Sequence, residues 1–216
     1  MILGPFLALV FFLLEPGGMI FDPAPSDDPV GNITALASNS TMAHITALGV
    51  PLGLILMLYG LAGINRVMEE SMAAALSRLG IMFMMVGAFG WILASGLNHI
   101  LAATAIESER ALETAIAIYR VDSGITMISS IAVATGFLAF NLGMAALFPS
   151  GPLRMGAVVI AVVSLVALIA LITGHTVPDE TMITLSRACY FPWVIWSVVL
   201  GVKFFEGGEF TRVGRI

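Results

Sequence analysis

The stretch MGAVVIAVVSLVALIALIT, residues 155–173, decides the fold of this chain, because it carries no charged side chain along its whole length. The hydrocarbon core of a bilayer is about 30 Å thick, and about 20 apolar residues in a helix cross it. The apolar run is continuous, whereas the strands of a membrane β-barrel alternate apolar and polar residues. The stretch therefore predicts a transmembrane helix.

The rest of the chain repeats this pattern. Hydrophobic residues make up 59% of the sequence and charged residues 11%, whereas soluble domains carry about 25% charged residues. We therefore predict an all-α fold, a polytopic transmembrane helical bundle that forms a single integral membrane domain over residues 1–216. About six spans are expected, at residues 2–21, 44–64, 79–103, 124–148, 155–173 and 182–205. Outer loops are expected at residues 22–42, 104–123 and 174–181.

The first apolar run, residues 2–21, is interrupted by Glu15 and by Pro16-Gly17-Gly18. A secretory signal peptide normally begins with a basic residue, and no Lys or Arg precedes this run. We interpret the run as a first spanning or half-buried helix.

Residues 105–121 are too charged to cross a membrane. Ile106, Leu112, Ile116 and Tyr119 fall near one face of a helix, with acidic and basic residues elsewhere. This pattern is typical of a short amphipathic helix that lies along the membrane surface. We expect it on the outer side.

The orientation follows from the basic residues, because Lys and Arg near span ends are retained on the cytoplasmic side. One arrangement places six cations inside: Arg66, Arg78, Arg154, Lys203, Arg212 and Arg215. It leaves three outside: Arg110, Arg120 and Arg187. We therefore expect a multi-pass protein of a bacterial or archaeal cytoplasmic membrane, with its C-terminus inside.

The three histidines lie at the expected outer ends of three different spans: His44, His99 and His175. Imidazoles that converge from separate helices can ligate a metal or a haem. Histidine is also tolerated where a helix meets the headgroups, and we favour this explanation because no pair has ligand spacing within one helix. The three histidines are thus candidates for binding a cofactor that the sequence does not identify, and no metal site is predicted.

Three further polar residues lie at or near membrane depth. Arg187 falls about one turn inside the sixth span and Asp122 just before the fourth, so the two side chains could pair. Asn141 lies deep in the fourth span, where we expect it to hydrogen-bond to a neighbouring helix. A role in a solute pathway is the alternative for Asn141.

Small residues form faces on three of the spans. Such faces let helix backbones approach closely, either within the chain or against another subunit. The residues are Gly49, Gly53 and Gly60, then Gly87, Gly90 and Ala94, and then Gly136 and Gly143.

The sequence predicts no enzyme, because no catalytic constellation is present. Cys189 is the only cysteine, and the nine Lys and Arg residues form no basic cluster, so neither an internal disulfide nor nucleic-acid binding is expected. We hypothesise an accessory or scaffold subunit whose partners are the lipid bilayer and other membrane protein subunits. The alternatives are a small-solute transporter or channel, and a haem- or metal-binding redox subunit that uses the outer histidines.

Overall fold

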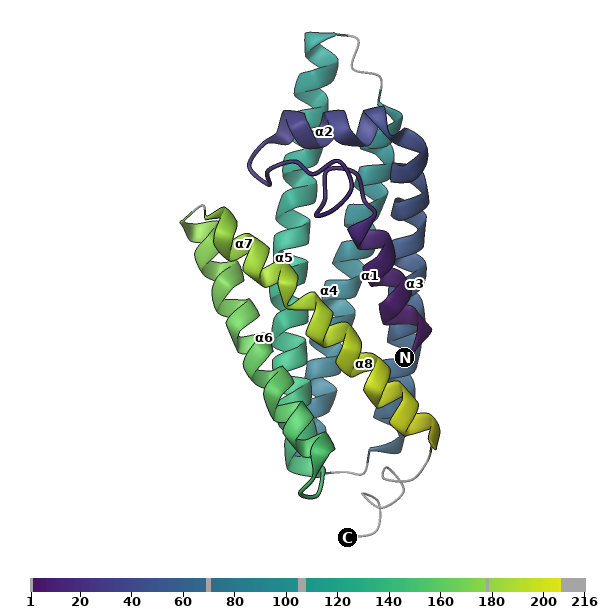
Figure 1. Cartoon of the computed structure of the whole chain (residues 1–216), viewed down its shortest axis with the longest axis vertical. Helices are drawn as coiled ribbons and strands as arrows, with labels where there is room; N and C mark the ends of the chain where they lie inside the picture. Colours follow the sequence, from purple (N-terminus) through teal and green to yellow (C-terminus); the bar gives the residue numbers. More distant parts are fainter. Residues whose placement is uncertain (1, 69–70, 105–107, 178, 207–216) are drawn as a thin grey trace.

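The computed structural model describes residues 2–68, 71–104, 108–177 and 179–206, and within them all regular structure is α-helical (Figure 1). The helices are α1 (Leu3–Leu13), α2 (Pro29–Ser38), α3 (Ser40–Val67), α4 (Met72–Ala103), α5 (Glu109–Leu147), α6 (Pro152–Thr176), α7 (Glu180–Ala188) and α8 (Tyr190–Glu206). The predicted all-α bundle is therefore confirmed.

Within the described part of the chain, five helical segments are long and apolar enough to cross a membrane: α3, α4, α5, α6, and α7 together with α8. Only 33% to 44% of the residues in their most apolar windows are buried, so large apolar side chains cover the outer face of the bundle. Examples are Leu48, Val86, Ile128, Val162 and Ile195, each between 56% and 68% exposed. Apolar surface of this extent is stable in lipid and not in water. The chain is a multi-pass integral membrane protein.

The first apolar run differs from a complete span. Its helix, α1, has 11 residues, and at 1.5 Å per residue it covers about half of the hydrocarbon core. The chain leaves the helix axis after Leu13, and Gly17 adopts a φ of 82°, which favours glycine. Helix α1 packs against α3, where a Cβ on Gly53 would lie 2.8 Å from the Ala8 Cα atom. The half-buried alternative thus fits the structure, and the bundle has five long helices instead of six.

The charged segment before the fourth span is not a separate surface helix. It is the first part of α5, which runs without a break from Glu109 to Leu147. The helix begins at Ser108, whose Oγ accepts a hydrogen bond from the Ala111 backbone N–H at 3.2 Å. No proline interrupts it, so helical hydrogen bonding continues through Asp122 and Gly124. The amphipathic pattern serves instead to pack this part of α5 against its neighbours.

A different short helix, α2, lies across one end of the bundle (Figure 1). Asp28 caps it, because its carboxylate accepts a hydrogen bond from the Gly31 backbone N–H at 3.0 Å. Helix α2 contacts α3, α4 and α5. We refer to this end as the α2 end of the bundle.

The last span is broken into α7 and α8. Pro192 has no N–H, and its ring conflicts with the carbonyl group of the residue four positions earlier, Ala188. Ala188 is the last residue of α7, and α8 begins at Tyr190. Helix α8 then runs diagonally across the bundle toward the end opposite α2 (Figure 1).

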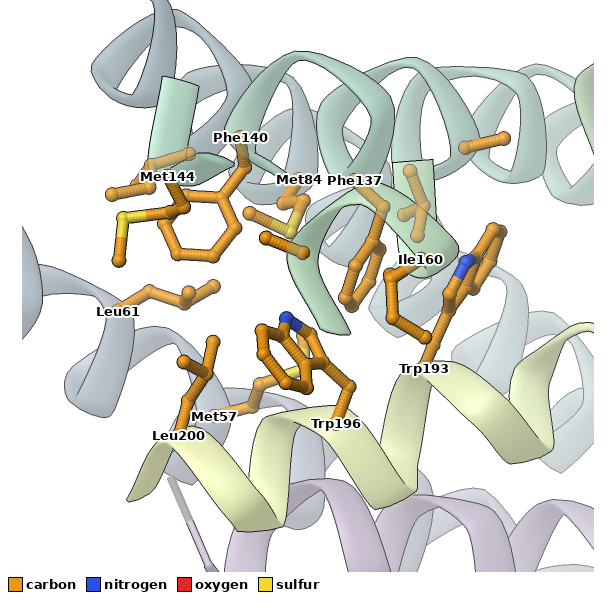
Figure 2. Close-up of a cluster of buried hydrophobic side chains, with 14 of the residues drawn as sticks. Met57, Leu61, Met84, Phe137, Phe140, Met144, Ile160, Trp193, Trp196 and Leu200 are labelled. Carbon is orange, nitrogen blue, oxygen red and sulfur yellow. The ribbon is translucent and has the colours of Figure 1, made fainter. Parts of the chain in front are cut away.

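The apolar core fills the half of the bundle away from the α2 end. Figure 2 shows Trp196 of α8 facing Phe140 and Met144 of α5, with Met57 and Leu61 of α3 beside them. All five of these side chains are at least 93% buried. Because this half is tightly packed, the open space within the bundle lies in the other half.

Candidate functional site

A cavity of about 390 Å³ lies in the half of the bundle nearest the α2 end. The cavity is lined by residues from every helix, α1 to α8, and from the loop between α1 and α2. Ligand sites in proteins typically have volumes of about 300–1,000 Å³. The space is therefore large enough for a small organic molecule.

One wall of the cavity is charged. Glu15 follows α1, and its Oε1 atom accepts a hydrogen bond from Asn98 Nδ2 of α4 at 2.5 Å. Asp122 of α5 is 7% exposed, and its Oδ1 atom has no hydrogen-bond partner among the described residues. Arg187 of α7 lines the same cavity. Ionisable side chains enclosed within a membrane protein are costly, and they therefore indicate a candidate functional site.

The Glu15 carboxyl group has an unusual proton affinity. Burial raises its pKa to about 7, and the hydrogen bond from Asn98 and the positive charge of Arg187 oppose that rise. Glu15 lies outside the five long helices, in the loop that follows α1. The group can therefore both hold and release a proton near neutral pH.

A second wall of the cavity is aromatic. Tyr190 of α8 lies at its centre, with ring centroids 5.5 Å from Phe12, 5.6 Å from Trp91 and 5.5 Å from Trp193. The Ser130 hydroxyl accepts a hydrogen bond from Trp91 Nε1 at 3.3 Å and lies 3.2 Å from the Tyr190 hydroxyl. These bonds satisfy polar groups that the rings bring into the cavity, and the rings themselves form part of its lining.

The floor of the cavity is apolar and closes it toward the core. Leu54, Met57, Val133 and Phe137 line the cavity and also belong to the core cluster. Phe137 stacks on Trp193 with the ring centroids 4.7 Å apart and an interplanar angle of 4°. The cavity thus ends in the packed half of the bundle.

The loop between α1 and α2 covers the cavity at the α2 end. The Ser26 hydroxyl donates a hydrogen bond to Glu180 Oε2 at 2.6 Å, and the Tyr119 hydroxyl donates one to the Ser26 carbonyl oxygen at 3.4 Å. Asn32 Nδ2 donates to the Pro25 carbonyl oxygen at 2.7 Å. These bonds join the loop to α7, α5 and α2.

The structure brings together two of the predicted polar residues. Asp122 and Arg187 both line the cavity, but within the described part of the chain no ion pair forms between them. Asn141 lies outside the cavity in the core, where its Oδ1 accepts a hydrogen bond from Trp196 Nε1 of α8 at 2.6 Å. Asn141 therefore bonds to a neighbouring helix.

The three histidines do not form one site. His44 Nδ1 and His99 Nδ1 are 2.9 Å apart, where α3 and α4 approach each other near the α2 end. His175 lines the cavity separately, and its Nδ1 atom lies 2.8 Å from the Leu171 carbonyl oxygen. Among the described residues no group of three or more His, Cys, Asp or Glu side chains is placed to hold a metal ion.

Glu15 is not among the candidate site residues that the sequence predicts, because there it only interrupts an apolar run. The structure places it opposite Asn98 in the cavity. The available signal was a carboxylate among apolar residues that only a polar partner or water could stabilise.

The fold and the cavity define a class: a multi-pass helical membrane protein with a cavity that is polar on one side and aromatic on the other. In comparisons with known proteins, no family model matches the chain, and neither a curated protein nor a solved structure matches it. The cavity itself is therefore the observation from which a function can be inferred.

Proposed function

We propose that this chain is a small-solute-binding membrane protein of the transporter type, and that its ligand is an amphiphilic organic molecule. The cavity supports this proposal, because buried charged groups and an aromatic surface face one space of about 390 Å³. Binding sites commonly combine a mostly apolar lining with a few placed polar groups. An open channel is less consistent with this arrangement, since packed core residues lie beneath the cavity floor.

Two observations weigh against the accessory-subunit hypothesis. Gly87 of α4 and Gly136 of α5, which belong to the predicted small-residue faces, pack against each other's helix within the chain and are therefore not available to another subunit. Polar side chains also gather around an interior cavity, as a solute-binding protein requires. The hypothesis stays a prediction, and stoichiometric protein partners recovered from native membranes in mild detergent would favour it over an autonomous binding protein.

Filling the cavity should abolish ligand binding. Thr126 of α5 lines the cavity, so Thr126→Trp places a large ring in the space that the ligand would occupy. We expect at least a tenfold loss of binding of 4-phenylbutanol, a neutral amphiphile of suitable size, to protein in lipid nanodiscs. Equilibrium dialysis of the labelled alcohol, corrected with empty nanodiscs, measures it.

The matched control is Ile128→Trp, on the same helix and 68% exposed on the outer face. It introduces the same ring into lipid and should leave binding within twofold of the parent protein. If the two variants bind the alcohol equally, the cavity is not a ligand site and the proposed function is wrong.

We further propose that the α2 end faces outward and that the C-terminus is cytoplasmic. The support is the excess of basic residues at the opposite end, including Arg78 and Arg154. In a Cys189→Ser background, Asp27→Cys should react with a membrane-impermeant maleimide on intact cells, and Glu206→Cys should react only after lysis. The reverse pattern would contradict this orientation.

A further inference from the structure

The charges that line the cavity are unbalanced. Three carboxylates, Glu15, Asp27 and Asp122, line the cavity together with one guanidinium, Arg187. Asp27 lies in the loop between α1 and α2 and is exposed, whereas Asp122 is buried. When the carboxyl groups are ionised, the lining carries excess negative charge.

The Asp122 carboxylate is the most informative of these groups. Its Oδ1 atom is buried and has no hydrogen-bond partner among the described residues. Leaving a buried polar atom unpaired costs about 1–3 kcal/mol, and more for a charged group. Among the described residues Arg187 forms no ion pair with it, so the chain itself does not supply the missing partner. A ligand that brings a positive charge and a donor N–H would satisfy this oxygen.

The aromatic wall favours the same kind of ligand. Aromatic faces attract organic cations, and recognition of ammonium groups commonly combines aromatic rings with carboxylates. Tyr190, Trp91 and Trp193 present such rings in the cavity that Asp122 lines. An inorganic cation would use the carboxylates and leave the aromatic surface without a role.

We propose that the cavity binds an organic monocation, an ammonium group joined to an apolar body, with the ammonium beside Asp122 and Glu15 and the body against the aromatic wall. This inference rests on the proposed function and specifies its ligand class. Arg187 reduces the negative charge near Glu15 and thereby directs the ammonium toward Asp122. An anionic amphiphile would face two carboxylates and bind poorly.

The test compares three probes that share one apolar body: 4-phenylbutylamine, 4-phenylbutanol and 4-phenylbutyrate. Protein in nanodiscs of neutral lipid is titrated with each probe at pH 8, where the amine carries a positive charge. We expect the amine to bind at least tenfold more tightly than the alcohol, and the carboxylate to bind more weakly than the alcohol.

The variant Asp122→Asn keeps the shape of the side chain and removes its charge. It should reduce the preference for the amine over the alcohol to less than threefold, mainly by weakening the binding of the amine. Glu113→Gln is the matched control, because Glu113 is an exposed carboxylate on the same helix and does not line the cavity. If Asp122→Asn fails to fold, Glu15→Gln and the probe ranking of the parent protein still test the charge preference.

Equal binding of the amine and the alcohol, or tighter binding of the carboxylate, would overturn the ligand class. In that case alcohol binding that Thr126→Trp removes would still support the proposed function. Conversely, if Thr126→Trp does not reduce binding of the alcohol, the proposed function itself is wrong, whatever the ranking of the probes.

Discussion

Replacing Gly136 with leucine is expected to cause the largest loss of folded protein of any single substitution considered, because α4 and α5 touch at this position. A Cβ on Gly136 would lie 2.7 Å from the Met84 backbone nitrogen and 2.8 Å from the Gly80 carbonyl oxygen. Backbone atoms cannot rotate away as a side chain can, so the helices must separate. Overpacking costs about 1–3 kcal/mol and occasionally more. We expect a value near the upper end, about 3 kcal/mol.

The measurement is the thermal unfolding midpoint of purified protein in one detergent, followed by aggregation or circular dichroism. For a chain of this size, about 3 kcal/mol corresponds to a fall of about 10 °C. Gly124→Leu is the matched control, since it lies on the same helix with nothing within 4 Å of an added Cβ. Both substitutions raise helix propensity by about 1 kcal/mol. Equal midpoints for the two variants would contradict the close approach of α4 and α5.

Exchanging Asn141 for leucine should produce the second large loss of stability. Asn141 is fully buried, and Trp196 Nε1 donates a hydrogen bond to its Oδ1 at 2.6 Å. Leucine has similar volume but accepts no hydrogen bond, so the indole N–H remains in the core without a partner. We expect the free energy of unfolding to fall by about 1–3 kcal/mol, the usual cost of an unsatisfied buried polar group.

A double-mutant cycle separates this bond from simple packing. Trp196→Phe leaves the Asn141 oxygen without its partner, whereas Asn141→Leu combined with Trp196→Phe removes both polar groups. The double variant should be clearly more stable than the sum of the two single losses predicts, because only the single variants leave a polar group unpaired. If the two losses of stability are additive, the hydrogen bond between Asn141 and Trp196 contributes little to stability beyond the packing of the two side chains.

The cavity and the core use the same two helices for different purposes. Helix α8 contributes Trp196 to the packed half and Tyr190 to the cavity, and α5 contributes Phe140 to one and Asp122 to the other. The Asn141 and Gly136 variants therefore test the packed half without changing any residue that lines the cavity. Both variants should lower stability, and Asn141→Leu, which does not require α4 and α5 to separate, should leave the preference among the three amphiphilic probes unchanged in the protein that still folds.

Several features could be predicted from the sequence because they depend on local composition. An apolar run such as residues 155–173 must become a helix in lipid, since only a helix satisfies its own backbone hydrogen bonds there. The same reasoning accounts for the all-α bundle and for the exposed apolar faces of the long helices. It also placed Asn141 in a span, where a polar side chain must bond to a neighbour.

Other features required the tertiary structure. Residues 2–21 have the composition of a span, but the helix within them stops at Leu13 and packs against half of α3. Residues 109–121 have the composition of a surface helix, but they continue into α5 because nothing interrupts the helix. Composition sets which segments are helical, whereas their lengths and junctions depend on the contacts that neighbouring helices provide.

The charged wall of the cavity is the clearest example of a feature that required the tertiary structure. Glu15, Asp122 and Arg187 lie far apart in the sequence, and each by itself resembles a residue near a membrane surface. Only the packing of α1, α5 and α7 places the three around one space. The sequence by itself determined a helical membrane protein, because hydrophobicity is a property of each segment. The tertiary structure alone decided that a cavity exists and what lines it, because a cavity is defined by what several helices leave unfilled between them.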